Sequence, residues 1–178
     1  NDLSDDNYVF DNAGEDGEGI KVTIGKNVTK IPAYLFSPSY YYDGYDPKIT
    51  SIVFAENSAC KTIGAYAFTH LKDLTEIIIP EGVESIGNSA FSGCTSLTNI
   101  TIPDNIKSIG TYAFDKCPLT YSEYNNAYYI GNESNPYVVL IKAKTTTGTS
   151  YTINSNTKAI YFRAFKNCTA LTSMVLPD

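Results

Sequence analysis

The sequence contains the six-residue stretch Ile63-Gly64-Ala65-Tyr66-Ala67-Phe68, and related stretches follow it at a fixed interval. It recurs 23 residues later as Ile86-Gly87-Asn88-Ser89-Ala90-Phe91, and after another 23 as Ile109-Gly110-Thr111-Tyr112-Ala113-Phe114. More divergent copies occupy residues 31–36 and 160–165. Self-similarity at a fixed period of this length is typical of repeat proteins. The sequence therefore predicts a chain built from stacked copies of one unit.

A second block alternates with the first, and it occurs at residues 74–80, 97–103 and 171–177. In its first copy, Ile77 and Ile79 alternate with Ile78, which is the pattern of a short strand with one buried face. Pro80 ends this strand, because proline has no N–H to donate to a ladder. We therefore expect Ile77 and Ile79 to point inward and Ile78 to point outward.

The rest of each unit predicts a second extended stretch and an outer arc. Val83 and Ile86 are expected to face inward, Gly87 to permit a turn, and Ala90 and Phe91 to bury a small and a large side chain. One such unit cannot bury its apolar face alone, whereas stacked units share a continuous core. The predicted architecture is a solenoid.

The double motif, Ile-Gly-x-x-Ala-Phe and then Cys-x-x-Leu-Thr-x-Ile-x-Ile-Pro, resembles the BspA-like class of leucine-rich repeats. The match is strongest over residues 63–119 and 160–178, and weaker copies extend it to about residue 20. The resemblance implies a curved leucine-rich-repeat solenoid of stacked parallel β-strands, with short helical or irregular turns on the outer arc. It also implies a secreted or cell-surface bacterial protein used in adhesion. No functional residue transfers, because the shared positions are the buried ones.

Two insertions break the period, at about residues 37–48 and 120–150. We expect residues 1–19 to form an acidic N-terminal cap or arm, and residues 20–178 to form a single leucine-rich-repeat domain. The first strand is predicted at residues 20–24. Because the chain starts without Met and stops within a repeat, we expect it to be a processed or trimmed product.

The larger insertion predicts a β-hairpin. Residues 127–130 and 137–142 are strand-like and are separated by a six-residue loop. We expect the hairpin to project from the solenoid and pack against its side, because an isolated hairpin is marginally stable in water. Either Val139 and Ile141 or Val138 and Leu140 would then face inward, leaving a Tyr-bearing face exposed.

Charge and composition exclude several classes of function. The 178 residues include 13 Lys and Arg against 19 Asp and Glu, a net charge of −6, which is a poor match for nucleic acid or an anionic membrane. The aliphatic runs are far shorter than the roughly 20 residues that a membrane-spanning helix requires. The acidic start lacks the ligand spacing of an EF-hand loop. No cofactor or metal is expected.

The residues able to do chemistry are few. Cys94, Cys117 and Cys168 share one position of the repeat with Leu71, which favours free, packed thiols over disulfides or zinc. His70, the only histidine, shares its position with polar residues and glycine, which indicates a solvated turn. Since no nucleophile, base and orienting residue can be assembled, we predict that the protein is not an enzyme.

Tyrosine is unusually common, with 15 Tyr and no Trp. Tyr34, Tyr66 and Tyr112 occupy core-like repeat positions. Tyrosine is enriched in recognition surfaces, so the tyrosines of the two insertions are candidate binding residues. Equally, these rings could simply cover the solenoid. The candidates are Tyr40, Tyr41, Tyr42, Tyr45, Tyr124, Tyr128, Tyr129 and Tyr137.

The outward residues of the strands form a second candidate surface. They are Thr23, Val53, Ile78, Thr101, Thr152 and Val175, and among them we expect Ile78 and Thr101 to contact a partner. Solenoids often bind through such a sheet face. The alternative is plain β-propensity, since exposed Thr, Val and Ile are good strand formers.

The leading functional hypothesis is a non-enzymatic protein-recognition or adhesion module. Its partner would be a host matrix protein or another bacterial surface protein, with no nucleic acid and no membrane insertion. A carbohydrate-binding accessory module is an alternative, in which Tyr rings serve as sugar platforms although Trp is missing. A structural spacer that displays another domain is the third.

Overall fold

The computed structural model describes residue 10, residues 12–38 and residues 46–177. In these residues it contains fourteen short strands joined by turns. The strands of the regular repeats are β1 (Ile20–Ile24), β2 (Lys30–Ile31), β3 (Ile49–Phe54), β4 (Thr62–Ile63), β5 (Glu76–Ile78), β6 (Ser85–Ile86), β7 (Asn99–Thr101) and β8 (Ser108–Ile109). The later strands are β9 (Ser122–Tyr124), β10 (Ala127–Ile130), β11 (Val139–Ala143), β12 (Ser150–Thr152), β13 (Ala159–Ile160) and β14 (Ser173–Val175).

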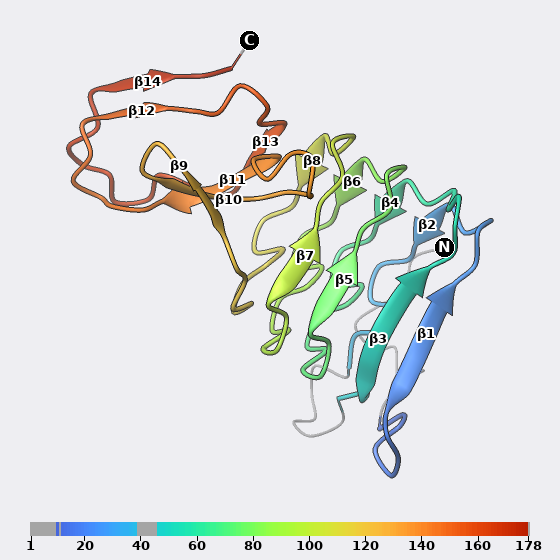
Figure 1. Cartoon of the computed structure of the whole chain (residues 1–178). Coiled ribbons are helices and arrows are strands. Elements are labelled where there is room, and N and C mark those ends of the chain that lie inside the picture. Colours follow the sequence, from blue (N-terminus) through green and yellow to red (C-terminus); the bar gives the residue numbers. More distant parts are fainter. Residues whose placement is uncertain (1–9, 11, 39–45, 178) are drawn as a thin grey trace.

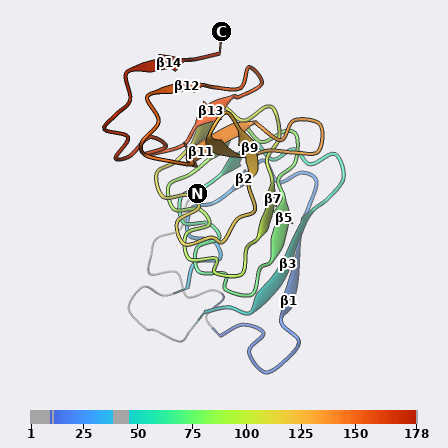
Figure 2. The same ribbon diagram turned by 60° about the vertical axis from the view of Figure 1, so that its left-hand side comes forward.

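The strands of the regular repeats stack in parallel, as the repeat predicts, and the predicted first strand coincides with β1 (Figure 1). β2, β4, β6 and β8 form one ladder in which Ile63 pairs with Ile86 and Ile86 with Ile109. On the other side of the solenoid, β1 pairs with β3 and β5 pairs with β7. Both rows are visible in Figure 1, and Figure 2 shows the row of β1, β3, β5 and β7 along the right-hand side of the stack. The leucine-rich-repeat solenoid is confirmed, and its outer turns are irregular in the described residues.

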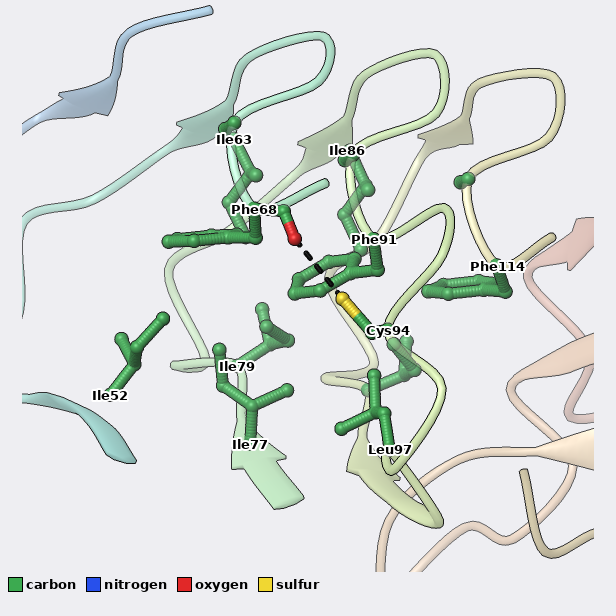
Figure 3. Close-up of a cluster of buried hydrophobic side chains, with 14 of the residues drawn as sticks. Ile52, Ile63, Phe68, Ile77, Ile79, Ile86, Phe91, Cys94, Leu97 and Phe114 are labelled. Atoms are coloured by element: carbon green, nitrogen blue, oxygen red, sulfur yellow. Dashed lines mark hydrogen bonds between the residues drawn. The ribbon is translucent and has the colours of Figure 1, made fainter. Parts of the chain in front are cut away.

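The inward and outward positions of the strands agree with the sequence pattern. Ile77 and Ile79 are each 2% exposed, whereas Ile78 is 70% exposed. On the arc, Phe91 stacks between Phe68 and Phe114 at centroid distances of 5.2 and 5.9 Å, and all three rings are buried (Figure 3). The solenoid core is therefore a row of aliphatic side chains from the strands, closed on one side by a row of phenylalanine rings.

The expectation that Tyr34, Tyr66 and Tyr112 are core residues is wrong. Each occupies the fourth position of the motif, where φ is positive, between 57° and 61°. In these three repeats the tyrosine side chain at this position does not enter the core. Tyr34 and Tyr66 instead stack on each other outside the core at 4.8 Å, and Tyr112 is 45% exposed. Arg163 occupies the same position in the last repeat, with φ of 59°.

Gly87 has a different role from the expected one. Its φ is not left-handed, but a Cβ atom at this position would lie 2.4 Å from the backbone nitrogen of Ala65. Gly64 and Gly110 meet the preceding repeat in the same way. Glycine is therefore required because the arcs of adjacent repeats approach closely, and not because the chain turns there.

The larger insertion contains the predicted hairpin. β10 and β11 pair antiparallel, and β9 adds a third strand on the other side of β10. Asn125 and Asn126 join β9 to β10 with φ values of 43° and 62°. Asparagine tolerates this left-handed conformation, which suits a two-residue hairpin turn.

The hairpin does not project from the solenoid; it takes the place of one repeat. Lys158 and Tyr161 donate backbone hydrogen bonds to the carbonyls of Val138 and Leu140, as Lys107 and Gly110 do to those of Glu84 and Ile86. β11 thus stands in the ladder position preceding β13. Similarly, Ile102 donates to Gly131 as Ile79 donates to Thr101. Residues 127–149 therefore form a divergent unit, which lacks the sequence motif of the others.

Both faces of β11 are covered, which corrects the expectation of one buried and one open face. Val138, Val139 and Leu140 are each 0% exposed. Val139 and Ile141 belong to the main core, whereas Leu140 belongs to a second core formed with Tyr129 and other residues. Because Val139 and Leu140 point into different cores, this part of the strand presents neither face to a partner, whereas Lys142 near its end is exposed.

Candidate functional site

The predicted binding tyrosines differ in where they lie and how far they are buried. Tyr40, Tyr41, Tyr42 and Tyr45 lie outside the described residues. Tyr129 is fully buried in the second core, so a partner cannot touch it. Tyr137 contacts both Tyr129 and Tyr124, at centroid distances of 5.5 and 5.6 Å.

The described insertion tyrosines therefore pack mainly against one another. Tyr128 and Tyr137 are half-buried, and Tyr124 is the most open of the group at 38% exposed. Tyr128 also packs 5.4 Å from Tyr121, under the ammonium group of Lys142. Sequence reasoning could not foresee this, because it depends on how the divergent unit folds back on its own strands.

The predicted row of outward strand residues is present on the sheet face. Thr23 is opposite Val53, Ile78 is opposite Thr101, and Thr152 is opposite Val175 in the three strand pairs. Val53, Ile78 and Val175 are exposed, whereas Thr101 is half-buried. The row is divided among separate sheets. Two adjacent apolar members of the row, Val53 and Ile78, lie on different sheets and face each other across a gap.

This gap is a groove of about 460 Å³ between β3 and β5. The two strands contact each other, yet no ladder joins them in the described part of the chain. Ile52 and Ile77 form the buried floor, and Val53 and Ile78 stand on the walls. β3 and β5 therefore do not pair with each other, and exposed aliphatic side chains lie where a ladder between them would run.

An irregularity in the chain lies beside the groove, in the connection that follows β3. From Ile52 to Ile63 the chain takes 11 residues, whereas the equivalent step from Ile77 to Ile86 takes 9. The two additional residues lengthen the connection from β3 to β4, while β4 still pairs in register with β6. These two residues are the sequence signal that could have pointed to the groove.

The rim of the groove is acidic. Glu56, Glu76 and Glu81 are among its described lining residues, which include no Lys or Arg. One basic group lies close by: the ammonium of Lys61 is 3.5 Å from the position of a Cβ at Gly82, a lining residue. A concave surface lined by one sign of charge concentrates the field and favours a partner of the opposite sign. None of these three glutamates was among the sequence-predicted site residues.

Two of the cysteines pack against the preceding repeat, and their thiols donate hydrogen bonds to backbone carbonyls. Cys94 occupies the buried slot that Leu71 fills in the preceding repeat, and its thiol donates to the carbonyl of Phe68 at 3.0 Å (Figure 3). Cys117 repeats this contact with Phe91 at 3.1 Å. The neighbouring Cys117 thiol and burial raise the pKa of the Cys94 thiol. A thiol held in its protonated form is a poor nucleophile.

His70 lies on the surface of the solenoid. It is exposed, and a Cβ at Gly93 would collide with its ring. Among the residues that the structure describes, no group of three or more His, Cys, Asp or Glu side chains is placed to hold a metal ion.

The model of the family described as "BspA type Leucine rich repeat region" matches residues 61–135 and 143–178, in six copies. The chain belongs to the BspA-type leucine-rich repeat family. The resemblance carried by the double motif is confirmed, and the matched region includes β10 of the divergent unit. Proteins of this repeat class are typically interaction or surface modules and typically not enzymes.

Several solved leucine-rich repeat structures are similar in fold. One is a leucine-rich repeat protein from Bacteroides ovatus ATCC 8483, with 24% identity over 88% of this chain and 34% of that chain, at a TM-score of 0.49. Another is the pneumococcal vaccine antigen PcpA, with 18% identity over 89% of this chain and 61% of that chain, at a TM-score of 0.46. This BspA-type chain spans about a third of the first and three fifths of the second. No curated protein matches it.

A third similar structure is the leucine-rich repeat protein TpLRR of T. pallidum, with 24% identity over 93% of this chain and 67% of that chain, at a TM-score of 0.41.

Within the residues that the structure describes, the BspA-type chain has no helix with the length and apolar character that crossing a membrane requires.

Proposed function

We propose that this chain is a non-enzymatic protein-recognition module of a secreted or cell-surface bacterial protein. Membership of the BspA-type repeat family supports this assignment. The observation that carries it is the groove between β3 and β5, where Val53 and Ile78 are exposed in a concave, acidic setting. Exposed aliphatic side chains around a hollow are typical of a surface that meets another molecule.

The groove favours a partner segment of defined chemistry. Its apolar walls suit an aliphatic or aromatic anchor, and the three rim glutamates suit Lys or Arg on either side of that anchor. An extended segment suits the groove because it can lie along the two strands and place its anchor side chain between Val53 and Ile78. A host matrix protein or another bacterial surface protein with such a segment is the partner we propose.

An array of extended peptides tests the groove directly. Each peptide has a central Leu or Phe, and the flanking positions carry Lys, Ser or Glu. We expect the purified chain to retain Lys-flanked peptides most strongly and Glu-flanked peptides least, and the difference to shrink as salt is raised. Equal retention of all three series, or none, would contradict the proposal.

Two matched variants locate the binding. Ile78→Lys places a charge on the groove wall, and Val175→Lys makes the same change at an exposed position on the sheet face outside the groove. Ile78→Lys should abolish peptide retention, and Val175→Lys should preserve it. The same pair is then tested on immobilised host matrix proteins and bacterial surface proteins. A partner bound equally by both variants is not recognised through this groove.

A further inference from the structure

The divergent unit opens a second cleft on the outer side of the solenoid. In regular repeats the chain turns after the second strand into the Ala-Phe arc, but here β11 runs straight on to Ala143. Ala143 donates to the carbonyl of Ala164 as Phe91 donates to that of Ala113, so it takes the backbone position of the arc phenylalanine without its ring. A cleft of about 400 Å³ lies between the arcs on either side, with Ile141 and Lys142 of β11 among its lining residues.

The charge of this cleft is opposite to that of the protein. Lys116, Lys142, Arg163 and Lys166 line it, together with one acidic residue, Asp115. The chain as a whole has a net charge of −6, and Arg163 is its only arginine. The salt bridges found among the described residues use other lysines, namely Lys72, Lys107 and Lys144. Four cations therefore converge without an ion-pair partner in that part of the chain, and they favour an anion.

Aromatic rings lie beside these cations. Tyr112, 45% exposed, meets Phe162 edge to face at a centroid distance of 5.1 Å. The guanidinium of Arg163 lies 4.8 Å from the centroid of the Phe162 ring, and the ammonium of Lys142 lies 5.0 Å from that of Tyr121. Such cation–π contacts hold a cation in place without neutralising it. The cleft thus offers a flat, partly open ring next to positive groups whose positions are restrained.

The floor of the cleft favours a compact ligand over a peptide strand. β11 is paired with β10 on one side and with β13 on the other. On the β13 side, Val139 and Leu140 are paired and Ala143 donates to Ala164, so the open stretch of edge is two residues long, too short for an extended peptide to add to. Recognition must come from side chains: ring faces, phenolic hydroxyls, ammonium groups and one guanidinium. A cleft of this volume has the size of a small-ligand site.

From these features we infer that the cleft binds an acidic saccharide, a sugar bearing a carboxylate or a sulfate group. The anionic group would lie against Arg163 and Lys142, and the apolar face of the sugar ring would lie on Tyr112. Arginine suits this role because its planar guanidinium matches the two oxygens of a carboxylate or a sulfate. This site is separate from the β3–β5 groove, and its assignment does not rest on the function proposed for that groove.

Calorimetric titration with defined oligosaccharides tests the inference. The probes are a galacturonic acid tetramer for the carboxylate, a chondroitin sulfate tetramer that also carries sulfate, and cellotetraose as the uncharged control. We expect one or both acidic sugars to bind, with affinity falling as salt is raised, and cellotetraose not to bind. The stronger of the two acidic probes identifies the preferred anion. Failure of both overturns the proposal.

Charge-matched variants assign the binding to the cleft. The pair Lys142→Gln and Arg163→Gln removes two cleft cations, whereas Lys26→Gln and Lys158→Gln removes two exposed lysines elsewhere. We expect the cleft pair to weaken acidic-sugar binding by about tenfold or more and the control pair by much less, since an ionised hydrogen-bond partner contributes more than a distant charge. Equal loss in the two pairs would mean that only net charge matters, which overturns the site.

A second comparison separates a sugar from an acidic peptide. Tyr112→Ala removes the ring platform, and Tyr112→Phe keeps it. Acidic-sugar binding should fall in the first variant and be retained in the second, whereas binding of a hexaglutamate peptide should be weak in both. Hexaglutamate binding that matches the sugars and ignores Tyr112→Ala would show an acidic-peptide site and overturn the proposal. Because Ile78→Lys leaves this cleft untouched, failure here and failure of the groove proposal are distinguishable.

Discussion

The hydroxyl of Tyr161 accepts a hydrogen bond from the backbone N–H of Phe114 at 3.1 Å. In the regular repeats the equivalent N–H groups, those of Phe68 and Phe91, donate to backbone carbonyls of the next repeat, each at 2.8 Å. The Tyr161 side chain thus supplies the acceptor that the divergent unit does not provide. Its ring also lies 5.6 Å from that of Phe114, which extends the aromatic row by one member.

Removing this hydroxyl should destabilise the junction. Tyr161→Phe keeps the ring but leaves the N–H of Phe114 without its acceptor, and an unsatisfied buried donor costs about 1–3 kcal/mol. Urea unfolding at pH 7 measures the loss. Tyr66→Phe is the control, because that tyrosine stacks on the outer surface. An equal, small effect of both changes would show that the bond contributes little.

The same side chain predicts a loss of stability at alkaline pH. Burial raises the pKa of Tyr161 from 10.0 to about 12. The unfolded state therefore loses this proton at lower pH than the folded state, so the stabilisation is complete below pH 10 and is lost between pH 10 and about 12. Unfolding free energies measured across this range should fall more steeply for the native chain than for Tyr161→Phe. Parallel curves would assign the alkaline loss to other groups.

Substitutions at inward and at outward positions of the strands and arcs should differ greatly in their cost to the free energy of unfolding. Phe91→Ala removes a buried ring from the middle of the aromatic row, and such truncations cost about 3–5 kcal/mol. Ile78→Thr changes a side chain that is 70% exposed, and exposed substitutions usually stay within about 0.5 kcal/mol. Denaturant titration compares the two, and similar costs would refute this assignment of faces.

The close approach of adjacent arcs predicts intolerance of a single methyl group. In Gly87→Ala the new Cβ would lie 2.4 Å from the nitrogen of Ala65, a backbone atom that cannot move aside alone. Overpacking of this kind costs about 1–3 kcal/mol or more. Gly25→Ala is the matched control, since nothing lies within 4 Å of its added Cβ. Thermal unfolding of the two variants decides the point; equal midpoints would mean that the arcs can separate freely.

Replacing residues 120–150 by a short Gly-rich link should prevent native folding of the C-terminal part. The segment includes Val138, Val139 and Leu140, all fully buried, and β11 supplies the ladder partner of β13. Circular dichroism and proteolysis report the outcome. As a control, glycine at the exposed positions Glu133 and Ser134 should leave the fold intact. A stable, protease-resistant deletion variant would show that the solenoid closes without its divergent unit.

The sequence predicted the regular part of the fold well, for a physical reason. Ile63, Ile86 and Ile109 occur at one spacing because they form one ladder, so the period in the sequence is the stacking in space. The divergent unit could not be predicted in this way. Val138 and Leu140 take the ladder positions through backbone hydrogen bonds, which any apolar residues could form, and no motif marks them.

The candidate sites were less accessible to sequence reasoning. Ile78 was correctly predicted to be exposed, but the neighbouring groove depends on the separation of β3 from β5, which its two extra residues only hint at. Tyr112 was mistaken for a core residue because the motif position gives no sign of a positive φ. The cationic cleft depends on an arc that is missing, and an absence in one unit is visible only once the units are superposed in space.

The position of β11 between two cores has a mechanical consequence. Tension applied at the C-terminal end would first load β14, which is paired with β12 and exposed along its length. The next barrier would be β11, because extracting that strand exposes Leu140 from one core and Val139 from the other at the same time. β11 therefore resists extraction under tension. The C-terminal unit that contains β12 and β14 would unfold first, and the regular repeats on the other side of β11 would stay folded.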